Sequence, residues 1–345
     1  MSRFRPPPLL RYIAIRALIS VFLLFGVTVM TFILTNLIPA DPVQAALGEL
    51  AAGDPQIVAQ FRANAGLDKP LPVQYGLYLE NLLHGDLGVS NQTRLPVAGE
   101  LSKAFPATVE LALVAMTFAV FIGIGMGLWA ALRHNRIVDH IIRTVSLVGI
   151  SIPTFWLGMV VFFVFFYQLG LLPGSGRLDP TVIPPPKITG LYTIDAVMAG
   201  QWGVALNALE HLVLPASTLA LFTIGLLTRF TRSSVLEVLS ADYIRAAKAK
   251  GLPPGTIIRD YVMRAALVPV LTMVGLTFGS LLSGTVLVEK IFSWHGLGEY
   301  AFMAATKLDL PAVMGVGLIV GFIYIGINFI VDLLYGFIDP RVRVQ

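Results

Sequence analysis

The residues of this chain that could do chemistry are few and far apart. Cysteine is absent, which excludes disulfides, thiol catalysis and thiolate-bound metals. The five histidines lack the short spacings typical of metal ligands: His84, His134, His140, His211 and His295. The sequence has no G-x-x-x-x-G-K-[ST] phosphate loop, no H-E-x-x-H zinc motif and no G-x-S-x-G nucleophile motif. We therefore predict that the chain has no catalytic residue, binds no metal and holds no cofactor.

Polar residues within apolar stretches form a second group with chemical potential, because burying them in a membrane is costly. Asn328 and Asp332 are four residues apart, so on a helix they share one face. There they could line a pathway, contact a neighbouring subunit or pack together. Glu110 and Asp332 are the acids that an ion-coupled transporter could use, and both lie near the ends of apolar stretches. We expect Glu289 and Lys290 at the outer membrane boundary, where water tolerates their charge.

Glycines recur at helical spacing in two apolar stretches. They stand at Gly123, Gly125, Gly127, Gly275, Gly279 and Gly284. Small residues let helices approach closely, but a glycine-rich face could equally belong to a wide pore. Both interpretations stay open for Gly279 and Gly284.

Basic and small residues concentrate in residues 231–264, which we call the elbow. We predict one helix over residues 233–250, because Val235, Leu239, Tyr243 and Ala246 form an apolar stripe at i, i+4 spacing. The next five residues read Gly-Leu-Pro-Pro-Gly and force a turn.

The turn in the elbow has helix-end signals on both sides. We expect Gly251 to adopt the left-handed conformation after the first helix, and Thr256 to cap a second helix over residues 257–264. The small side chains of Ala246, Ala247 and Gly251 would let another protein approach closely. An interfacial helix whose basic face contacts anionic lipid accounts for the pattern equally well.

The composition indicates whether the elements that carry these residues lie in water or in a membrane. Of the 345 residues, 56% are hydrophobic and only 13% are charged, against roughly 25% charged in soluble domains. This excludes a nucleic-acid-binding domain, a disordered chain and an ordinary cytosolic enzyme. Six charge-free stretches approach or exceed the ~20 residues that cross a membrane as a helix. They cover residues 17–38, 111–132, 144–176, 212–228, 265–288 and 310–331. We predict an all-α membrane protein with six transmembrane helices and a kink at Pro153.

The basic residues predict the orientation of these helices. Sixteen of the 24 Lys and Arg residues fall on the side that carries both termini and the elbow. We therefore expect both termini in the cytoplasm. The first stretch has 22 apolar residues, which favours an uncleaved anchor over a signal peptide. Three segments remain outside: residues 39–104, which we predict to be an external subdomain, and the loops at residues 173–210 and 289–309. Residues 73–83 of the subdomain show a helical stripe of Tyr75, Leu79 and Leu82.

Blocks of sequence along most of the chain resemble one family. The longest, DYIRAAKAKGLPPGTIIRDYVMRAALVPV at residues 242–270, resembles the cytoplasmic coupling loop of bacterial ATP-binding-cassette importer permeases. The other blocks fit the dipeptide/oligopeptide/nickel permease family in the right order. They are NLIPADP (36–42), GLDKPLPVQY (66–75), HGDLGVS (84–90), SIPTFWLG (151–158), RSSVLEVL (232–239), FSWHGLG (292–298) and VDLLYGFIDPRVR (331–343).

The resemblance implies a type I importer permease fold, with residues 1–38 as N-terminus and first span, 39–104 as the external subdomain and 105–345 as the permease core. It implies coupling to an ATPase subunit through Arg245, Ala246, Ala247, Lys250, Gly251 and Leu252. It places a gate or binding-protein contact at Trp294, His295 and Gly296, and leaves Asn328, Asp332, Gly279 and Gly284 for the pathway or a subunit interface. Arg245 stands where the general permease pattern has Glu, which is usual in the peptide branch, and His295 stands where the family usually has Pro.

The resemblance also implies the partners. They are a second, homologous permease that completes a heterodimer, two ATPase subunits that use ATP and Mg, an extracytoplasmic binding protein and a peptide substrate. The location implied is the bacterial inner membrane, in contact with lipid and with no nucleic acid. A slight preference for dipeptides rests on the segment at residues 182–202. Nickel chelates, glutathione-like compounds, an ion-coupled transporter and, less favoured, a membrane protease remain alternatives.

Overall fold

The computed structural model describes residues 8–37, 54–64, 66 and 68–338, which are helical with no strand among them. Five helices are long and apolar enough to cross a membrane, and a bent pair supplies a sixth span if it is counted as one. The expected all-α membrane fold is confirmed. The long helices are α1 (Pro8–Leu37), α5 (Val97–Leu132), α9 (Trp202–Leu239), α12 (Arg264–Gly284) and α15 (Leu310–Ile338).

The remaining helices are shorter and form two groups along the sequence. The first group comes after α1 and before α9 in the sequence, interrupted by α5: α3 (Pro55–Asn64), α4 (Leu71–Leu83), α6 (Ile137–Ser151), α7 (Thr154–Val161), the π-helical η1 (Phe162–Gln168) and α8 (Tyr192–Met198). The other follows α9: α10 (Asp242–Ala249), α11 (Pro254–Thr256), the π-helical η2 (Ile257–Met263), α13 (Val286–Ile291) and α14 (Leu297–Thr306).

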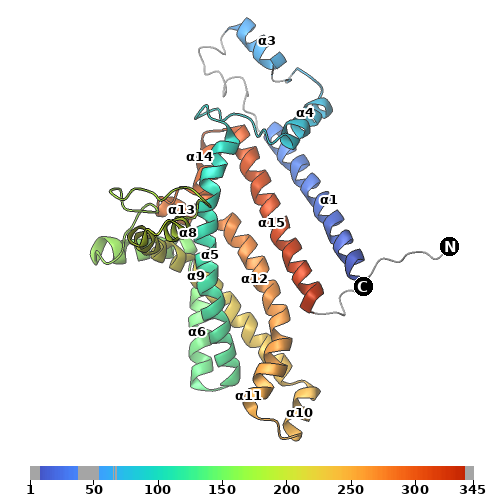
Figure 1. The fold of residues 1–345 in the computed structure, drawn as a ribbon, viewed down its shortest axis with the longest axis vertical. Helices are drawn as coiled ribbons and strands as arrows, with labels where there is room; N and C mark the ends of the chain where they lie inside the picture. The colour runs from blue at the N-terminus through green and yellow to red at the C-terminus, as the bar shows by residue number, and fades with distance from the viewer. Residues whose placement is uncertain (1–7, 38–53, 65, 67, 339–345) are drawn as a thin grey trace, which may run out of the picture.

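The core lies where α5 and α9 run side by side with α12 against them (Figure 1). Gly123 and Gly127 of α5 make the close approach possible, since a Cβ on either would lie within 3 Å of atoms of α9. The prediction of close packing is thus confirmed at these two positions, whereas a Cβ on Gly125 would have no neighbour within 4 Å. Small residues at the α5–α9 contact therefore set the helix spacing.

The predicted kink at Pro153 is a sharp break. Helices α6 and α7 differ in direction by 98° across Ile152 and Pro153. Proline has no N–H to donate and its ring pushes the preceding residue out of the helical conformation, so the helix ends at Ser151. The long apolar stretch is consequently divided at this break, with η1 continuing from α7 and its Phe162 packing against the core.

Helix α1 packs against α15 at the edge of the bundle (Figure 1). Gly321 has no side chain and leaves room for Val27, which would lie 2.7 Å from a Cβ at this position. Arg16 forms an ion pair with Asp332 at 2.8 Å. Helix α4 contacts α1 beside the start of α15, and it confirms the helix predicted over residues 73–83. The ring of Tyr75 of α4 is tilted against that of Phe32, with 5.3 Å between the centroids, and the Tyr75 hydroxyl lies 2.8 Å from that of Thr28.

The expected external subdomain is described only in part. Its residues 39–53 lie outside the described residues, as do the termini that carry four of the basic residues used for orientation. Its last residues, 97–104, form the first turns of α5. Pro106 lies inside this helix and does not end it, so the helix continues into the span. Within the described range the segment therefore consists of α3, α4, the loop that leads into α5 and the first turns of α5.

Candidate functional site

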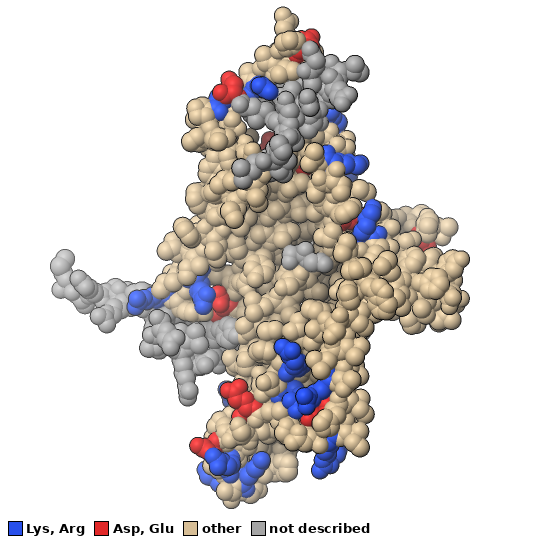
Figure 2. Space-filling model, turned by 180° about the vertical axis from the view of Figure 1, so that it is seen from behind, with Lys and Arg blue, Asp and Glu red and all other residues tan. Residues whose placement is uncertain are grey.

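The elbow lies at one end of the molecule and is built from the last turns of α9, the helices α10 and α11, and η2. Lys and Arg gather at this end in Figure 2, which is the end where Figure 1 places α10 and α11. The single helix predicted over residues 233–250 is wrong. Helix α9 ends at Leu239 and α10 begins at Asp242. At the break the Ser240 hydroxyl donates to the Glu237 carbonyl at 2.7 Å, a local bond that competes with helix continuation.

The break lets α10 fold back on its own small core. Ile244 and Ala247 of α10 are buried together with Val235 of α9 and with Ile257 and Val262 of η2. The predicted apolar stripe is wrong beyond Leu239, because Tyr243 and Ala246 are exposed. The true inward face of α10 is one residue further along the chain. The elbow is therefore a folded unit rather than a helix lying on a surface.

The turn after α10 is a Schellman motif that satisfies the last carbonyls of the helix. Gly251 donates to the carbonyl of Lys248 at 3.0 Å and Leu252 donates to that of Ala247 at 3.4 Å. The expected left-handed conformation of Gly251 is confirmed, with φ +74°. Thr256 is not the predicted cap, since α11 begins earlier, at Pro254, where a missing N–H costs nothing.

The predicted coupling residues divide between the surface and the interior of the elbow. Exposed positions are Arg245, Ala246, Lys250 and Gly251. Leu252 is half-buried and Ala247 is buried, so the side chain of Ala247 packs inside the elbow instead of being presented to a partner. Arg245 forms an ion pair with Asp242. The structure therefore offers a basic outer face of α10 that ends in a rigid glycine turn.

A buried ion pair fixes the elbow to the bundle. Arg232 of α9 donates from Nε and Nη2 to the two carboxylate oxygens of Asp139, at 2.6 and 2.8 Å. Asp139 is completely buried and also accepts the backbone N–H of Asn135 at 3.0 Å. The residues of this pair are 93 positions apart. Sequence analysis missed it, although Asp139 is the sole acid in an otherwise basic loop.

Away from the elbow, the loop between α13 and α14 folds over the N-terminal half of α5. Glu289 is buried rather than solvated, which corrects our expectation for this residue. Its carboxylate accepts hydrogen bonds from the hydroxyls of Thr108 and Thr285, at 2.6 and 2.8 Å, and from the N–H of Glu299 at 2.9 Å. Three donors replace the water that we had expected to stabilise this charge.

The predicted gate or contact residues lie in this same loop in different environments. Trp294 is completely buried and its indole N–H donates to the Ala107 carbonyl at 2.8 Å, so its ring anchors the loop. Gly296 lies so close to Thr108 and Glu289 that a Cβ there would collide with them. His295 alone points outward, with its side chain 76% exposed and its Nδ1 3.3 Å from Glu299.

Next to His295, a cavity of about 750 Å³ opens between α5, residues 176–184 and α14. Its charged lining residues carry both signs: Glu100, Lys103, Arg177, Asp179, His295 and Glu299. The hydroxyl of Tyr300, also in the wall, donates to Glu100 at 2.8 Å. Burial and this hydrogen bond raise the pKa of the Tyr300 hydroxyl, so the hydroxyl stays protonated at neutral pH.

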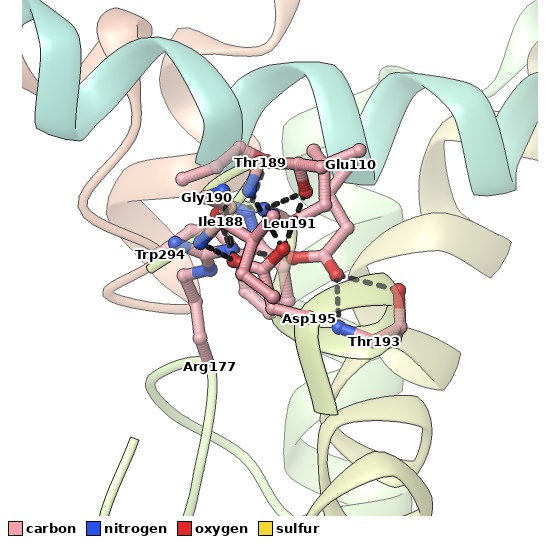
Figure 3. A network of polar contacts seen from close by, with 10 residues as sticks. Glu110, Arg177, Ile188, Thr189, Gly190, Leu191, Thr193, Asp195 and Trp294 are labelled. Atoms are coloured by element: carbon pink, nitrogen blue, oxygen red, sulfur yellow. Dashed lines mark hydrogen bonds and ion pairs between the residues drawn. The ribbon is translucent and has the colours of Figure 1, made fainter. Parts of the chain in front are cut away.

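One wall of this cavity belongs to the external loop at residues 173–210, which we call the external segment. A network of polar contacts holds it in place (Figure 3). Arg177 donates to Glu110 at 2.6 Å and to the Gly190 carbonyl at 2.9 Å, while its guanidinium lies 3.6 Å from the ring centroid of Tyr192. Glu110 also accepts from the N–H and the hydroxyl of Thr193, both at 2.7 Å. Glu110 is therefore a structural anchor with its partners in place.

Asp195 organises the same segment. Its carboxylate accepts the backbone N–H groups of Ile188, Thr189 and Gly190 at 3.2, 2.8 and 2.8 Å (Figure 3). Burial raises the pKa of the Asp195 carboxyl, but these hydrogen bonds and that of the Thr189 hydroxyl outweigh burial and hold the pKa below its usual range. Gly190 has φ +83° and lies against Pro106, where no side chain fits.

The residues expected at the pathway or at a subunit interface have partners within the chain. Asp332 pairs with Arg16, and Asn328 donates to the Tyr324 carbonyl at 2.9 Å. Gly279 faces the ring of Tyr324, while Gly284 is the last residue of α12. In the described part of the chain, no three His, Cys, Asp or Glu residues are grouped so that they could hold a metal ion.

Comparisons with known proteins agree with this architecture. The family model of the binding-protein-dependent transport system inner membrane component matches residues 123–344, and the model of that family's N-terminal region matches residues 9–112. The chain is 47% identical over 322 residues to a probable D,D-dipeptide transport system permease protein of Escherichia coli (strain K12), covering 93% of this chain and 94% of that one.

Two further relatives align over nearly their whole length. A di/tripeptide transport system permease protein of Pseudomonas aeruginosa (strain UCBPP-PA14) is 45% identical, with 98% of this chain and 100% of that one covered. A dipeptide transport system permease protein of Alkalihalophilus pseudofirmus is 42% identical, with 97% and 100% covered. A solved inward-facing structure of the MetNI methionine ABC transporter has a similar fold, with a TM-score of 0.50 at 16% identity over 69% of this chain and 96% of that one.

Proposed function

Because the chain belongs to the family of binding-protein-dependent transport system inner membrane components, we propose that it forms half of the pathway by which an ATP-driven importer carries dipeptides and other short peptides into the cytoplasm. It is a multi-pass subunit of the inner membrane with no active site of its own. Its partners are a second, homologous permease, two ATPase subunits that bind ATP and Mg, and an extracytoplasmic peptide-binding protein. The names of the three relatives and their coverage support the peptide substrate.

One observation carries the coupling role that we propose for the elbow. The elbow is a folded unit with its own core, and it is continuous with α9, whose 38 residues extend to the external segment. At about 1.5 Å per residue this helix is roughly 57 Å long. A push on α10 therefore has to cross only the short break at Ser240 before it reaches α9, and this one long helix extends to the external side.

The mechanism follows from that layout. When ATP closes the two ATPase subunits, they displace the exposed face of α10 around Arg245, Ala246, Lys250 and Gly251. The ion pair of Arg232 with Asp139 makes α6 and α9 move together. The spans then rock and open the pathway outward, so that the docked binding protein releases its peptide. Hydrolysis restores the inward-facing state. The ATPase must contact the elbow more favourably in one of these states for this coupling to work.

We place the contact with the binding protein at the external cavity. His295 is the member of the Trp294–His295–Gly296 trio that presents a surface, and charges of both signs surround it. A peptide zwitterion and a charged protein rim both suit such a lining. Trp294 and Gly296 pack against α5 and hold this loop in place. Asp332 and Gly279 have packing partners inside the chain, so we assign them to helix packing rather than to the pathway.

No observation favours an ion-coupled transporter. Such a protein needs a carboxylate that gains and loses a proton or cation during the cycle. Glu110 is held by Arg177 and Thr193, and Asp332 by Arg16. Both acids that the sequence offered for this role are thus engaged in structural contacts.

The test compares substitutions on the two faces of α10. Ala246→Trp puts a large side chain on the exposed face, so the ATPase subunits should no longer co-purify and peptide uptake should be lost, while the chain stays folded in the membrane. Ala247→Trp should instead disrupt the buried core of the elbow and lower the unfolding temperature. Ala199→Trp, an exposed position of the external segment, is the control for the bulk of Trp. Normal ATPase binding and uptake with Ala246→Trp would refute the coupling role.

A further inference from the structure

A second cavity, away from the elbow turn and the external loops, lies between α6 and α9 at the basic end of the molecule. It has a volume of about 250 Å³ and its walls come from both helices. The polar groups in its lining are three arginines and three hydroxyls: Arg143, Arg229, Arg232, Ser146, Thr228 and Ser233. Arginine and hydroxyl groups together are the donors that recognise phosphate oxygens.

The charges in this cavity are not balanced. Arg232 is engaged with Asp139, which is the carboxylate at this site. Arg143 and Arg229 are exposed, and neither has a carboxylate oxygen within 4 Å among the residues that the structure describes. Three arginines against one aspartate leave two positive charges. In addition, the Thr228 hydroxyl is buried without a hydrogen-bond partner in the described chain, which leaves a donor for a ligand oxygen.

The apolar sequence around the cavity places it at the membrane boundary. On α6 the charge-free stretch of residues 144–176 begins directly after Arg143, and on α9 the stretch of residues 212–228 ends directly before Arg229. Two adjacent helices thus change from apolar to basic at the same level, because α6 packs along α9. This is the depth at which lipid phosphate groups lie.

An apolar groove adjoins the cavity on its membrane side. Its volume is about 550 Å³ and it runs along α6 to the break before α7, with Thr144, Leu147, Val148, Ile152, Pro153 and Trp156 in its lining. Leu147 lines both the groove and the basic cavity. A free phosphate ion would occupy only the cavity, whereas a phospholipid would place its head group in the cavity and an acyl chain in the groove.

We propose that the α6–α9 cavity is a specific binding site for an anionic phospholipid. Arg143 and Arg229 bind the phosphate group, Arg232 and the hydroxyls of Thr228 and Ser233 complete its surroundings, and an acyl chain follows α6 toward Pro153. The Ser146 hydroxyl donates to the Ile142 carbonyl at 2.8 Å and only lines the cavity. A bound lipid would join the two helices that Arg232 and Asp139 already link. The site is distinct from the exposed face of α10, so its failure would leave the proposed transport function untouched.

The experiment measures lipid retention by the full chain with native mass spectrometry. The purified protein is titrated with phosphatidylglycerol, with phosphatidylcholine and with inorganic phosphate. We expect one phosphatidylglycerol molecule to be retained in preference to phosphatidylcholine. The double variant Arg143→Gln with Arg229→Gln should weaken its binding by about tenfold or more, because each basic residue near an anionic lipid contributes to its affinity. Arg143→Lys with Arg229→Lys keeps the charge and should retain most of it.

Arg133→Gln with Arg136→Gln is the matched control, since both residues are exposed at the same end but outside the cavity. It should leave retention unchanged, and equal unfolding temperatures will show that all variants are folded. The proposal is overturned if phosphatidylcholine binds as well as phosphatidylglycerol, or if both double Gln variants lose lipid equally. It is also overturned if millimolar inorganic phosphate displaces the lipid completely, which would identify a site for a free anion only.

Discussion

At the scale of single residues, the backbone conformation of Gly251 determines the shape of the elbow. Its φ of +74° lets the chain reverse after α10 while the last carbonyls of the helix stay bonded. Other L-residues in this conformation cost roughly 1–2 kcal/mol, and asparagine tolerates it best. There is open space around the missing side chain, since no atom lies within 4 Å of a Cβ built there. Backbone strain and steric bulk can therefore be separated at this position.

We predict that Gly251→Val abolishes peptide uptake while Gly251→Asn retains most of it. The β-branched side chain resists the left-handed conformation and should unwind the turn, whereas Asn should preserve it. Uptake of labelled dipeptide and co-purification of the ATPase subunits, measured on both variants at equal membrane abundance, decide the matter. Equal activity of the two variants would mean that the turn geometry does not contribute to coupling.

The two ion pairs of the elbow region differ in burial and should differ in energy. Arg232→Met leaves Asp139 unpaired in the interior, which costs about 3–5 kcal/mol. Arg245→Met removes an exposed pair with Asp242 and should cost less than about 1 kcal/mol. Thermal unfolding in detergent should therefore show a large loss for the first variant and a small one for the second. Similar losses would show that the Arg232 pair is not desolvated as the structure indicates.

At the scale of elements, one carboxylate of the external segment, Asp195, organises the backbone of residues 188–190. Asp195 holds three successive N–H groups, so the segment keeps its shape without regular secondary structure over residues 176–191. Because the pKa of Asp195 is lowered in the folded state, its stabilisation is complete above the usual pKa of an aspartate. The stabilisation is lost as the pH falls through the lower, folded-state value.

We predict that protection of the backbone N–H groups of residues 188–190 decreases as the pH is lowered below about 4. Hydrogen exchange corrected for its intrinsic pH dependence measures this effect. Asp195→Asn should abolish the pH dependence and lower protection already at neutral pH, since each hydrogen bond to a charged acceptor contributes roughly 1.5–3 kcal/mol. Protection in the Asn variant that matches the original chain at neutral pH would contradict this role.

How far the sequence predicted these elements depended on the range of the interactions. Charge-free stretches located the spans, Pro153 located the break in the third span, and the residues around Gly251 located the turn. The helix break at Ser240 was missed because the apolar stripe continues through it, and only the packing of Ile244 against α9 and η2 shows that the register shifts. Arg232 with Asp139 and Arg177 with Glu110 join residues 93 and 67 positions apart, which no local pattern could indicate.

At the scale of the whole molecule, the long helix α9 and the uneven distribution of charge define the two ends. Basic residues gather at the end that carries the elbow (Figures 1 and 2). The cavity with charges of both signs lies away from that end, between α5, residues 176–184 and α14. By the positive-inside rule, we predict that the elbow faces the cytoplasm. In that orientation we propose that the elbow meets the ATPase subunits and that the external loops meet the binding protein.

This orientation is testable with reporter fusions. A fusion at Gly200, in the turn before α9, should report from outside the membrane, and a fusion after Gln345 should report from the cytoplasm. The basis is the excess of Lys and Arg on the cytoplasmic side of the predicted spans. A cytoplasmic signal at Gly200 would invert the arrangement and separate the elbow from any ATPase.

The central claim is that ATP, and not an ion gradient, drives peptide movement through this chain. The direct measurement is uptake of labelled dipeptide by sealed proteoliposomes that contain the chain with its co-purified partner subunits, with the binding protein added outside and ATP sealed inside. We predict uptake that requires both ATP and the binding protein, and that a proton ionophore leaves unchanged. Uptake driven by a proton or sodium gradient without ATP would contradict the account.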